Sequence, residues 1–239
     1  MTDEEKFVEN LYDEANEELK EVYRQQKEVR DKILQEIAMI MLTYTVLDGL
    51  MSIGKKDKEK IYKKLSGLII INYKNISNKE VKVLNNILES TVKKTFNFYS
   101  YNADLKDIKH IIESNFKGKH FSERIWSNEK NIVNHLHKQI KGFINGEVNV
   151  NQIKKNIEKT FNVSAYNAKR LVTTEVSRCQ NEAFRKLCEE TNVKKVKRNA
   201  ILDSKTCDDC YPLNGKIYEL KDMPQISHPM CRCFYEIYE

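Results

Sequence analysis

Proline is missing from most of this sequence. Pro212, Pro224 and Pro229 are its only three prolines, and all lie within the last 28 residues. A proline inside a helix costs about 3 kcal/mol, so the preceding residues are free to form long, uninterrupted helices. The sequence also lacks any stretch of about 18 uncharged apolar residues, which excludes a membrane-spanning helix. Its charged start, MTDEEKFVEN, has neither signal-peptide nor transit-peptide character, so we expect synthesis in a reducing cytoplasm.

Motifs of common enzyme classes are absent as well. The sequence has no phosphate-binding loop, no G-x-G-x-x-G fingerprint and no obvious pairing of a nucleophile with a base. Glu175 and Arg178 stand three residues apart in a predicted helix, a spacing that favours a surface ion pair over a catalytic pair. The same helical face carries Arg170, Thr174 and Asn181. We expect this face to pack against a small lobe at the C-terminal end of the chain or against a partner. We predict that the protein is not an enzyme.

Hydrophobic spacing of three and four residues predicts the helices. We expect one or two long helices over residues 3–52, a break at Gly54, and then helices over 57–74 and 78–98, the second entered through Ser77-Asn78. A shorter helix begins at Asn102 or Asp104 and reaches about Phe116. The remaining predicted helices cover residues 121–145, 149–160 and 165–191, with Phe161–Ser164 as a link and Ser164 as an N-cap.

The chain changes character after Asn192. Val193, Val196, Ala200 and Leu202 indicate a short strand, and turn residues with four cysteines follow. The predicted fold class is therefore mainly α, with long N-terminal helices and an α+β C-terminal domain that ends in a small zinc-stapled β lobe. We expect a helical, partner-binding region over 1–119, a second domain over 120–239, and the lobe over 193–239.

Charge is distributed unevenly along the chain. The net charge is +6 overall, −7 over residues 1–50, −3 over residues 201–239 and +16 over residues 51–200. The basic middle fits a Lys-rich solvated surface and a non-specific contact with double-stranded DNA about equally well. The apolar stripe Ile33–Ile37–Met41–Tyr44 predicts that the N-terminal helices lie against a partner.

The cysteines of the last 33 residues form the most specific pattern. Cys207 and Cys210 make a C-x2-C pair, and His228 and Cys231 follow after 17 residues as H-x2-C. Two tight pairs of soft ligands at this spacing indicate one tetrahedral zinc ion with a structural role. We predict Cys207, Cys210, His228 and Cys231 as its ligands. Four protein ligands would leave no open position for a reacting water.

Two alternatives use the same residues. Cys233 could replace Cys231 as the fourth ligand, because both would point to the same face of a strand. Disulfides could form instead of a zinc site, although synthesis in a reducing cytoplasm argues against them.

From about Phe121 to its end, the chain resembles the head-morphogenesis proteins of tailed phages, the phage Mu F-like minor capsid family. The resemblance is carried by Arg124–Trp126, Phe161–Ala183, Asp203–Cys210, Leu213–Lys216 and His228–Cys233. The family often has an aromatic residue ahead of the Asp of its D-x-x-T-C motif, where this chain has Arg198-Asn-Ala200.

The resemblance implies a structural protein of the virion, made in the host cytoplasm and carried inside the capsid in few copies near the portal vertex. It also implies the portal protein as partner, with the scaffold or major capsid protein as further partners, and a role in assembly or in genome packaging and ejection. Two hypotheses compete with this reading: a zinc-dependent or toxin-like enzyme, and a nucleic-acid-binding zinc protein. The acidic C-terminal lobe has the wrong sign for docking phosphates.

Overall fold

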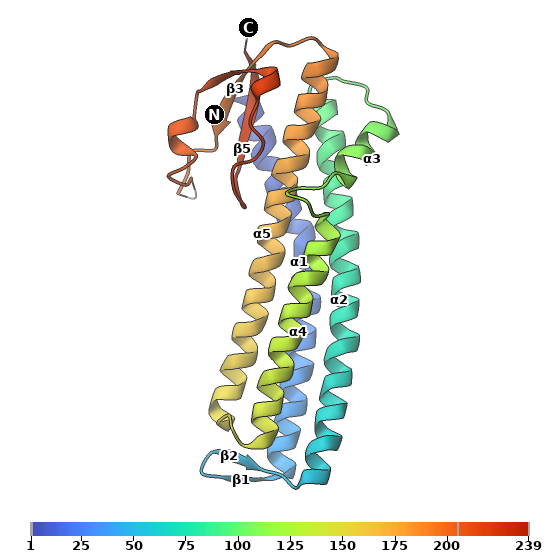
Figure 1. Cartoon of the computed structure of the whole chain (residues 1–239), viewed down its shortest axis with the longest axis vertical. Coiled ribbons are helices and arrows are strands. Elements are labelled where there is room, and N and C mark those ends of the chain that lie inside the picture. Colours follow the sequence, from blue (N-terminus) through green and yellow to red (C-terminus); the bar gives the residue numbers. More distant parts are fainter. Residues whose placement is uncertain (1, 205, 239) are drawn as a thin grey trace. The chain divides into compact units, whose positions relative to one another are not determined.

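A computed structural model describes residues 2–204 and 206–238 of the chain. Five helices make up most of it: α1 (Asp3–Thr43), α2 (Lys55–Phe98), α3 (Leu105–Glu113), α4 (Phe121–Asn145) and α5 (Val150–Glu190) (Figure 1). A hairpin of β1 (Thr45–Leu47) and β2 (Leu50–Ser52) joins α1 to α2. The predicted class, mainly helical with a small C-terminal sheet, is confirmed. No helix among the described residues is long and apolar enough to cross a membrane.

Three predicted boundaries are wrong. Residues 45–52 form the hairpin instead of continuing the first helix, because Asp48 and Gly49 both adopt positive φ angles and make a tight turn. The break at Ser77 is absent, since the Ser77 hydroxyl donates to the Tyr73 carbonyl inside α2. The link at 161–164 is also absent: α5 is continuous, and Ser164 is a buried residue within it. The N-cap at Asp104 is confirmed, with its side chain accepting from the Asp107 amide.

The helices contribute to two compact units. One unit comprises Met1–Leu19, Lys82–Phe121 and Lys169–Glu239, and the other comprises Lys20–Val81 and Ser122–Ala168. We call them the lobe unit and the helical unit. Each draws residues from both sides of position 120. The predicted regions 1–119 and 120–239 are regions expected to fold independently of each other. The two compact units do not test that expectation, so it stays a prediction.

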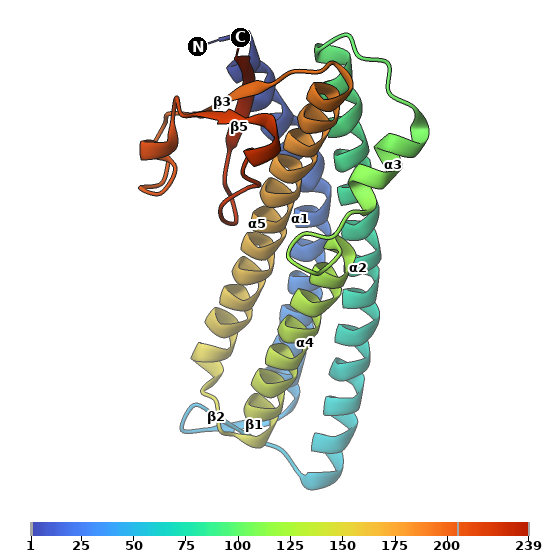
Figure 2. The same ribbon diagram turned by 45° about the horizontal axis from the view of Figure 1, so that its top comes forward.

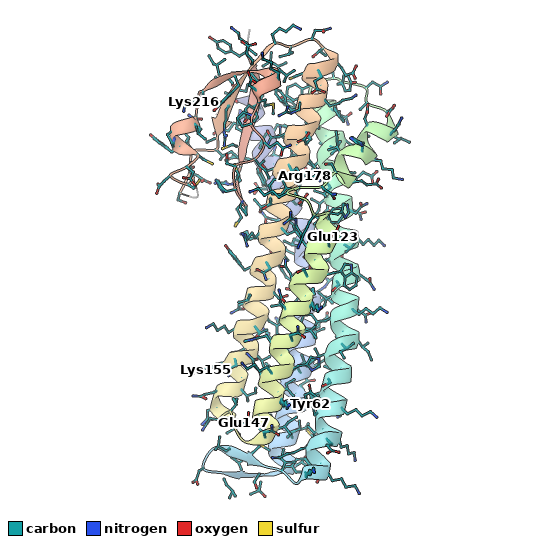
Figure 3. The ribbon with its side chains drawn as sticks, viewed as in Figure 1. Tyr62, Glu123, Glu147, Lys155, Arg178 and Lys216 are labelled. Atoms are coloured by element: carbon teal, nitrogen blue, oxygen red, sulfur yellow. The ribbon has the colours of Figure 1, made fainter. Side chains whose placement is uncertain are left out.

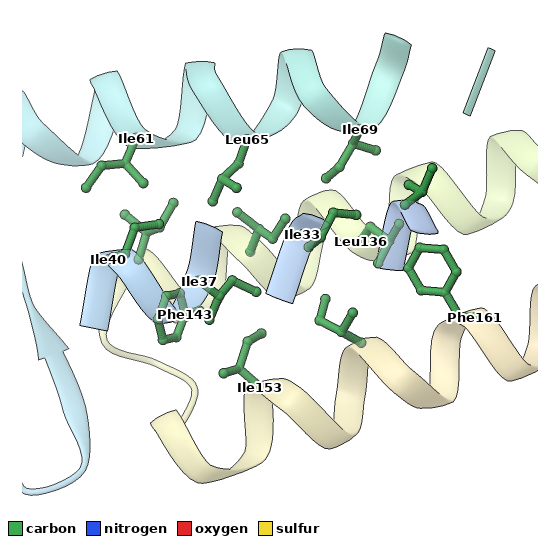
Figure 4. Close-up of a cluster of buried hydrophobic side chains, with 14 of the residues drawn as sticks. Ile33, Ile37, Ile40, Ile61, Leu65, Ile69, Leu136, Phe143, Ile153 and Phe161 are labelled. Carbon is green, nitrogen blue, oxygen red and sulfur yellow. The ribbon is translucent and has the colours of Figure 1, made fainter. Parts of the chain in front are cut away.

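The helical unit has an aliphatic core supplied by segments of α1, α2, α4 and α5 (Figure 4). Its members include Ile33, Ile37, Leu65, Ile69, Leu136, Phe143, Ile153 and Phe161. Ile33 and Ile37 belong to the stripe that the sequence pattern reserves for a partner, and Met41 and Tyr44 pack against the same core. That assignment is wrong, because the stripe is covered by the chain's own helices.

The lobe unit contains the C-terminal sheet, in the order β4-β3-β5, with all pairs antiparallel. Its strands are β3 (Lys195–Ala200), β4 (Ile217–Glu219) and β5 (Cys233–Tyr238), with the short 3-10 helices η1 (Tyr211–Leu213) and η2 (Leu220–Asp222) between them. Figures 1 and 2 both place β3 and β5 beside the C-terminal part of α5. The strand predicted around residues 193–202 is confirmed as β3.

Candidate metal centre

Two tight turns and one strand pairing bring the cysteines and the histidine together. In the first turn the amides of Cys210 and Tyr211 donate to the Cys207 carbonyl, at 3.0 and 3.1 Å. In the second, the Cys231 amide donates to the His228 carbonyl at 3.2 Å. Cys233 begins β5 opposite Ala200 of β3. The C-x2-C turn therefore brings the ligand atoms of Cys207 and Cys210 together, and the second turn holds His228 and Cys231 on one loop.

The ligand atoms form two overlapping triplets. Those of Cys207, Cys210 and His228 lie within 4.8 Å of one another, as do those of Cys210, Cys231 and Cys233. The Nε2 atom of His228 is 3.0 Å from the Cys207 sulfur and 3.1 Å from the Cys210 sulfur, and the sulfurs of Cys210 and Cys231 are 3.7 Å apart. The four predicted ligands and Cys233 thus lie in one cluster, as two triplets that share Cys210.

In kind and in cavity size these residues suit a metal ion, and the Cys231 sulfur, which shares a triplet with neither Cys207 nor His228, would move toward them on binding. A cavity of about 20 Å³ is lined by all five side chains. Two sulfurs bound to one tetrahedral zinc at about 2.3 Å lie about 3.8 Å apart, close to the Cys210–Cys231 separation. Sulfur and imidazole nitrogen on such an ion lie about 3.5 Å apart, so His228 would move outward by about half an ångström. The donor set can hold one metal ion.

The imidazole of His228 is oriented from its other side. Its Nδ1 atom lies 2.8 Å from the Pro229 carbonyl oxygen. A carbonyl can only accept, so Nδ1 carries the proton in the neutral ring and Nε2 presents its lone pair to the sulfurs. Metal-bound histidines commonly make such a hydrogen bond with the second ring nitrogen.

Protonation differs among the cysteines. A hydrogen bond from Cys233 lowers the pKa of Cys231 to about 5, and the same bond raises the pKa of Cys233. Burial opposes ionisation of Cys207, but hydrogen bonds from the side chain and backbone of Cys210 lower the pKa of Cys207. The buried guanidinium of Arg198 lies beside Cys233 and opposes the rise in the pKa of Cys233. The thiolate of this pair is therefore on Cys231.

Helix α5 contacts the C-terminal lobe, residues 193–239, through the helical face that carries Thr174 and Asn181. The Met230 amide donates to the Thr174 hydroxyl at 3.0 Å, and the Asn181 amide group donates to the Cys233 carbonyl at 3.1 Å. Met230 directly precedes the predicted ligand Cys231, and Cys233 is the alternative ligand. The expectation that this face docks the lobe is confirmed.

The ion pair of Glu175 and Arg178 exists but is not on the surface. Arg178, labelled in Figure 3, is 5% exposed and lies 2.7 Å from Glu175, which is 1% exposed. Arg178 also donates to the Ile111 carbonyl and the Ser114 hydroxyl at the end of α3. The predicted surface location is wrong, because Arg178 satisfies carbonyls that α3 leaves unpaired at its C-terminal end.

Sequence comparison adds one finding. Residues 131–236 match the family described as "Phage Mu protein F like protein". This segment contains all five side chains of the metal centre. The resemblance stated from the motifs is thereby confirmed for this part of the chain. No curated protein and no solved structure matches the chain.

Proposed function

We propose that the chain is a minor structural protein of a phage head, acting in head morphogenesis, because residues 131–236 match the phage Mu protein F-like family. The family match is the observation that carries this proposal. The protein would be made in the host cytoplasm and incorporated into the capsid interior near the portal. There it would contribute to assembly or to packaging and ejection of the genome.

The metal proposed for the centre is zinc, with a structural role. Three thiolates and one imidazole are the ligands that zinc favours in structural sites. The buried residues packed around the centre are few: Phe116, Ala200, Cys210, Ile226, Cys231 and Cys233. Half of these are cysteines, so apolar burial alone contributes little to the folding free energy of the C-terminal lobe. A bound ion would supply the remaining stability of the lobe.

Cys231 is the proposed fourth ligand, with Cys233 as its hydrogen-bond donor. Two features support Cys231 as the ligand and Cys233 as the donor. The Cys231 sulfur lies at a tetrahedral spacing from that of Cys210, and the low pKa of Cys231 provides the thiolate that a metal requires. A zinc ion with Cys207, Cys210, His228 and Cys231 has no open position, which supports a non-enzymatic role.

Partner contacts are proposed for the portal protein, with the scaffold or major capsid protein as further candidates. Within the proposed partner-binding region 1–119, the exposed apolar side chains are the best candidates, now that the stripe around Ile37 is internal. Leu42 is 82% exposed, and Leu47 and Ile71 are also largely exposed. Packaged double-stranded DNA would be contacted through the basic residues of 51–200.

The test is mass spectrometry of purified particles of the phage that encodes the chain. The proposal expects the protein in DNA-filled heads at few copies, and expects a deletion mutant to yield fewer infectious particles. Its absence from particles, with normal titres after deletion, would contradict the proposal.

A further inference from the structure

A second concavity lies in the lobe unit beside the metal centre. This cleft has a volume of about 460 Å³, within the range of small-ligand sites in proteins. Its walls come from the first turns of α1, from α5 and from the loops that carry Cys207 and His228. It is more than twenty times larger than the cavity between the sulfurs, so a single metal ion does not account for it.

One wall of the cleft is acidic. Glu9, Tyr12, Asp13 and Asn16 line it from α1, at the i, i+3, i+4 and i+7 positions that share one face of a helix. Tyr12 is buried, whereas the two carboxylates reach toward solvent. Neither Glu9 nor Asp13 forms an ion pair with any residue of the described chain. Two carboxylates four residues apart thus face the cleft without a counter-ion.

Helix α5 contributes to the cleft a hydroxyl with no partner among the described residues. Thr173 of α5 is 8% exposed and lines the cleft. Within residues 2–204 and 206–238 its hydroxyl makes no hydrogen bond, unlike that of the neighbouring Thr174. The hydroxyl oxygen itself is not fully buried, so it is accessible from the cleft. A ligand entering the cleft could supply that partner.

The basic residues of the cleft do not balance the acidic wall. The guanidinium of Arg232 is held by Asp203, and it therefore compensates that carboxylate. Among the described residues that line the cleft, exposed Lys169 is the remaining side chain with a permanent positive charge. Two carboxylates against one ammonium favour a cationic ligand. Among the described residues, neither Glu9 nor Asp13 belongs to a group that could hold a metal ion, so an organic cation fits better than a metal.

We propose that this cleft binds an arginine or lysine side chain presented by a segment of a partner protein. Its cationic head would pair with Glu9 and Asp13 and donate to the Thr173 hydroxyl, while its aliphatic stem packs on Met230 and Tyr12. The volume admits such a side chain together with its flanking backbone. The proposal rests on the cleft alone and holds whether or not the chain is a phage head protein.

The test is isothermal titration calorimetry of the purified full chain with blocked tripeptides. The central residue is arginine in one peptide, its neutral isostere citrulline in the second, and glutamate in the third. We expect saturable binding of the arginine peptide and at least about tenfold weaker binding of the citrulline peptide, the usual worth of a desolvated charge-assisted hydrogen bond. The glutamate peptide should not bind.

Variants locate the binding. Glu9→Gln combined with Asp13→Asn should weaken the arginine peptide at least about tenfold. The matched control, Glu18→Gln with Glu189→Gln, removes the same charge from two exposed carboxylates outside the cleft and should leave affinity unchanged. Thr173→Val should weaken binding severalfold, and Lys169→Gln should strengthen it. If the acidic double variant fails to fold, Lys169→Gln still tests the role of charge, because removing the cation of the cleft should strengthen binding of the arginine peptide.

Three results would overturn the proposal. Equal binding of the arginine and citrulline peptides would remove the role of charge. Equal affinity of the acidic double variant and its control would place binding elsewhere. Tighter binding of 1,4-diaminobutane than of the arginine peptide, at the same residues, would assign the cleft to a free organic cation instead of a protein segment.

Discussion

Two carboxyl groups buried in the helical unit should make its stability depend on pH. Glu80 of α2 is 3% exposed and Glu129 of α4 is 5% exposed. Glu129 accepts from the Ser164 hydroxyl at 3.3 Å, and Ser164 in turn accepts from the Gln26 side chain at 3.0 Å. No cation of the described chain pairs with either carboxyl group. The other titratable groups that face them, Tyr23 and Tyr73, are neutral.

Burial, and after it the carboxyl of Glu129, raises the pKa of Glu80 to about 8. Burial raises the pKa of Glu129 to about 7, against a small opposing effect of the Ser164 hydrogen bond. The folded protein therefore keeps protons that the unfolded chain releases above a pH of about 4.5. The free energy of unfolding must fall as the pH rises from there toward 8. A shift from 4.5 to about 8 corresponds to about 5 kcal/mol for Glu80, and the smaller shift of Glu129 to about 3 kcal/mol.

The assay is urea unfolding between pH 5 and pH 9. The wild type should lose several kcal/mol over this range, with a slope of at most about 1.4 kcal/mol per pH unit for each group. Glu80→Gln should remove about half of the slope below pH 7 and most of it between pH 7 and pH 8, because glutamine keeps the shape without the titration and Glu129 still titrates. Exposed Glu59 provides the control, and Glu59→Gln should change nothing. An unaltered slope in both Glu80→Gln and Glu129→Gln would refute the reasoning.

Three further predictions concern other contacts. Arg178→Met should lower the free energy of unfolding by about 3–5 kcal/mol, since it leaves the buried Glu175 carboxylate unpaired; adding Glu175→Gln should restore part of that loss in urea unfolding. Thr174→Val removes the acceptor of the Met230 amide and should cost about 1–3 kcal/mol, with faster hydrogen exchange at that amide; unchanged exchange would contradict it. DNA binding by the basic middle should be non-specific and steeply salt-dependent in fluorescence anisotropy, and a sequence-specific or salt-insensitive complex would count against it.

Helix content could be predicted from the sequence because it depends on the lack of proline and on local spacing. Gly54 and Asp104 were interpreted correctly, since each acts within a few residues of its own position. The predicted helix starts at Ser77 and Ser164 are wrong, because a serine inside a helix and a serine at a cap look the same in a sequence. Burial decides between them: the Ser77 hydroxyl bonds within its own helix, and that of Ser164 bonds across to Glu129.

The hairpin at residues 45–52 has a local sequence signal. Asp48-Gly49 stands between two short apolar runs, and Asp-Gly is a favoured pair for a two-residue hairpin turn. The buried carboxyl pair had no such signal. Glu80 and Glu129 lie in different helices, and their apposition depends on packing that no local spacing encodes.

The metal centre could be predicted in composition because its spacings are local turns. The choice between Cys231 and Cys233 could not, since both lie near one strand and the sulfurs of both are within 4.8 Å of that of Cys210. The cleft around Glu9 and Thr173 was likewise invisible, because its walls come from the two ends of the sequence.

The most direct test of the central claim is the zinc content of the purified chain, measured by elemental analysis and native mass spectrometry. The account predicts one zinc per chain in the wild type and none in Cys207→Ser, whose far-ultraviolet helical signal should stay largely intact. A folded wild type without zinc, with the cysteines of residues 207–233 joined in disulfides, would contradict it.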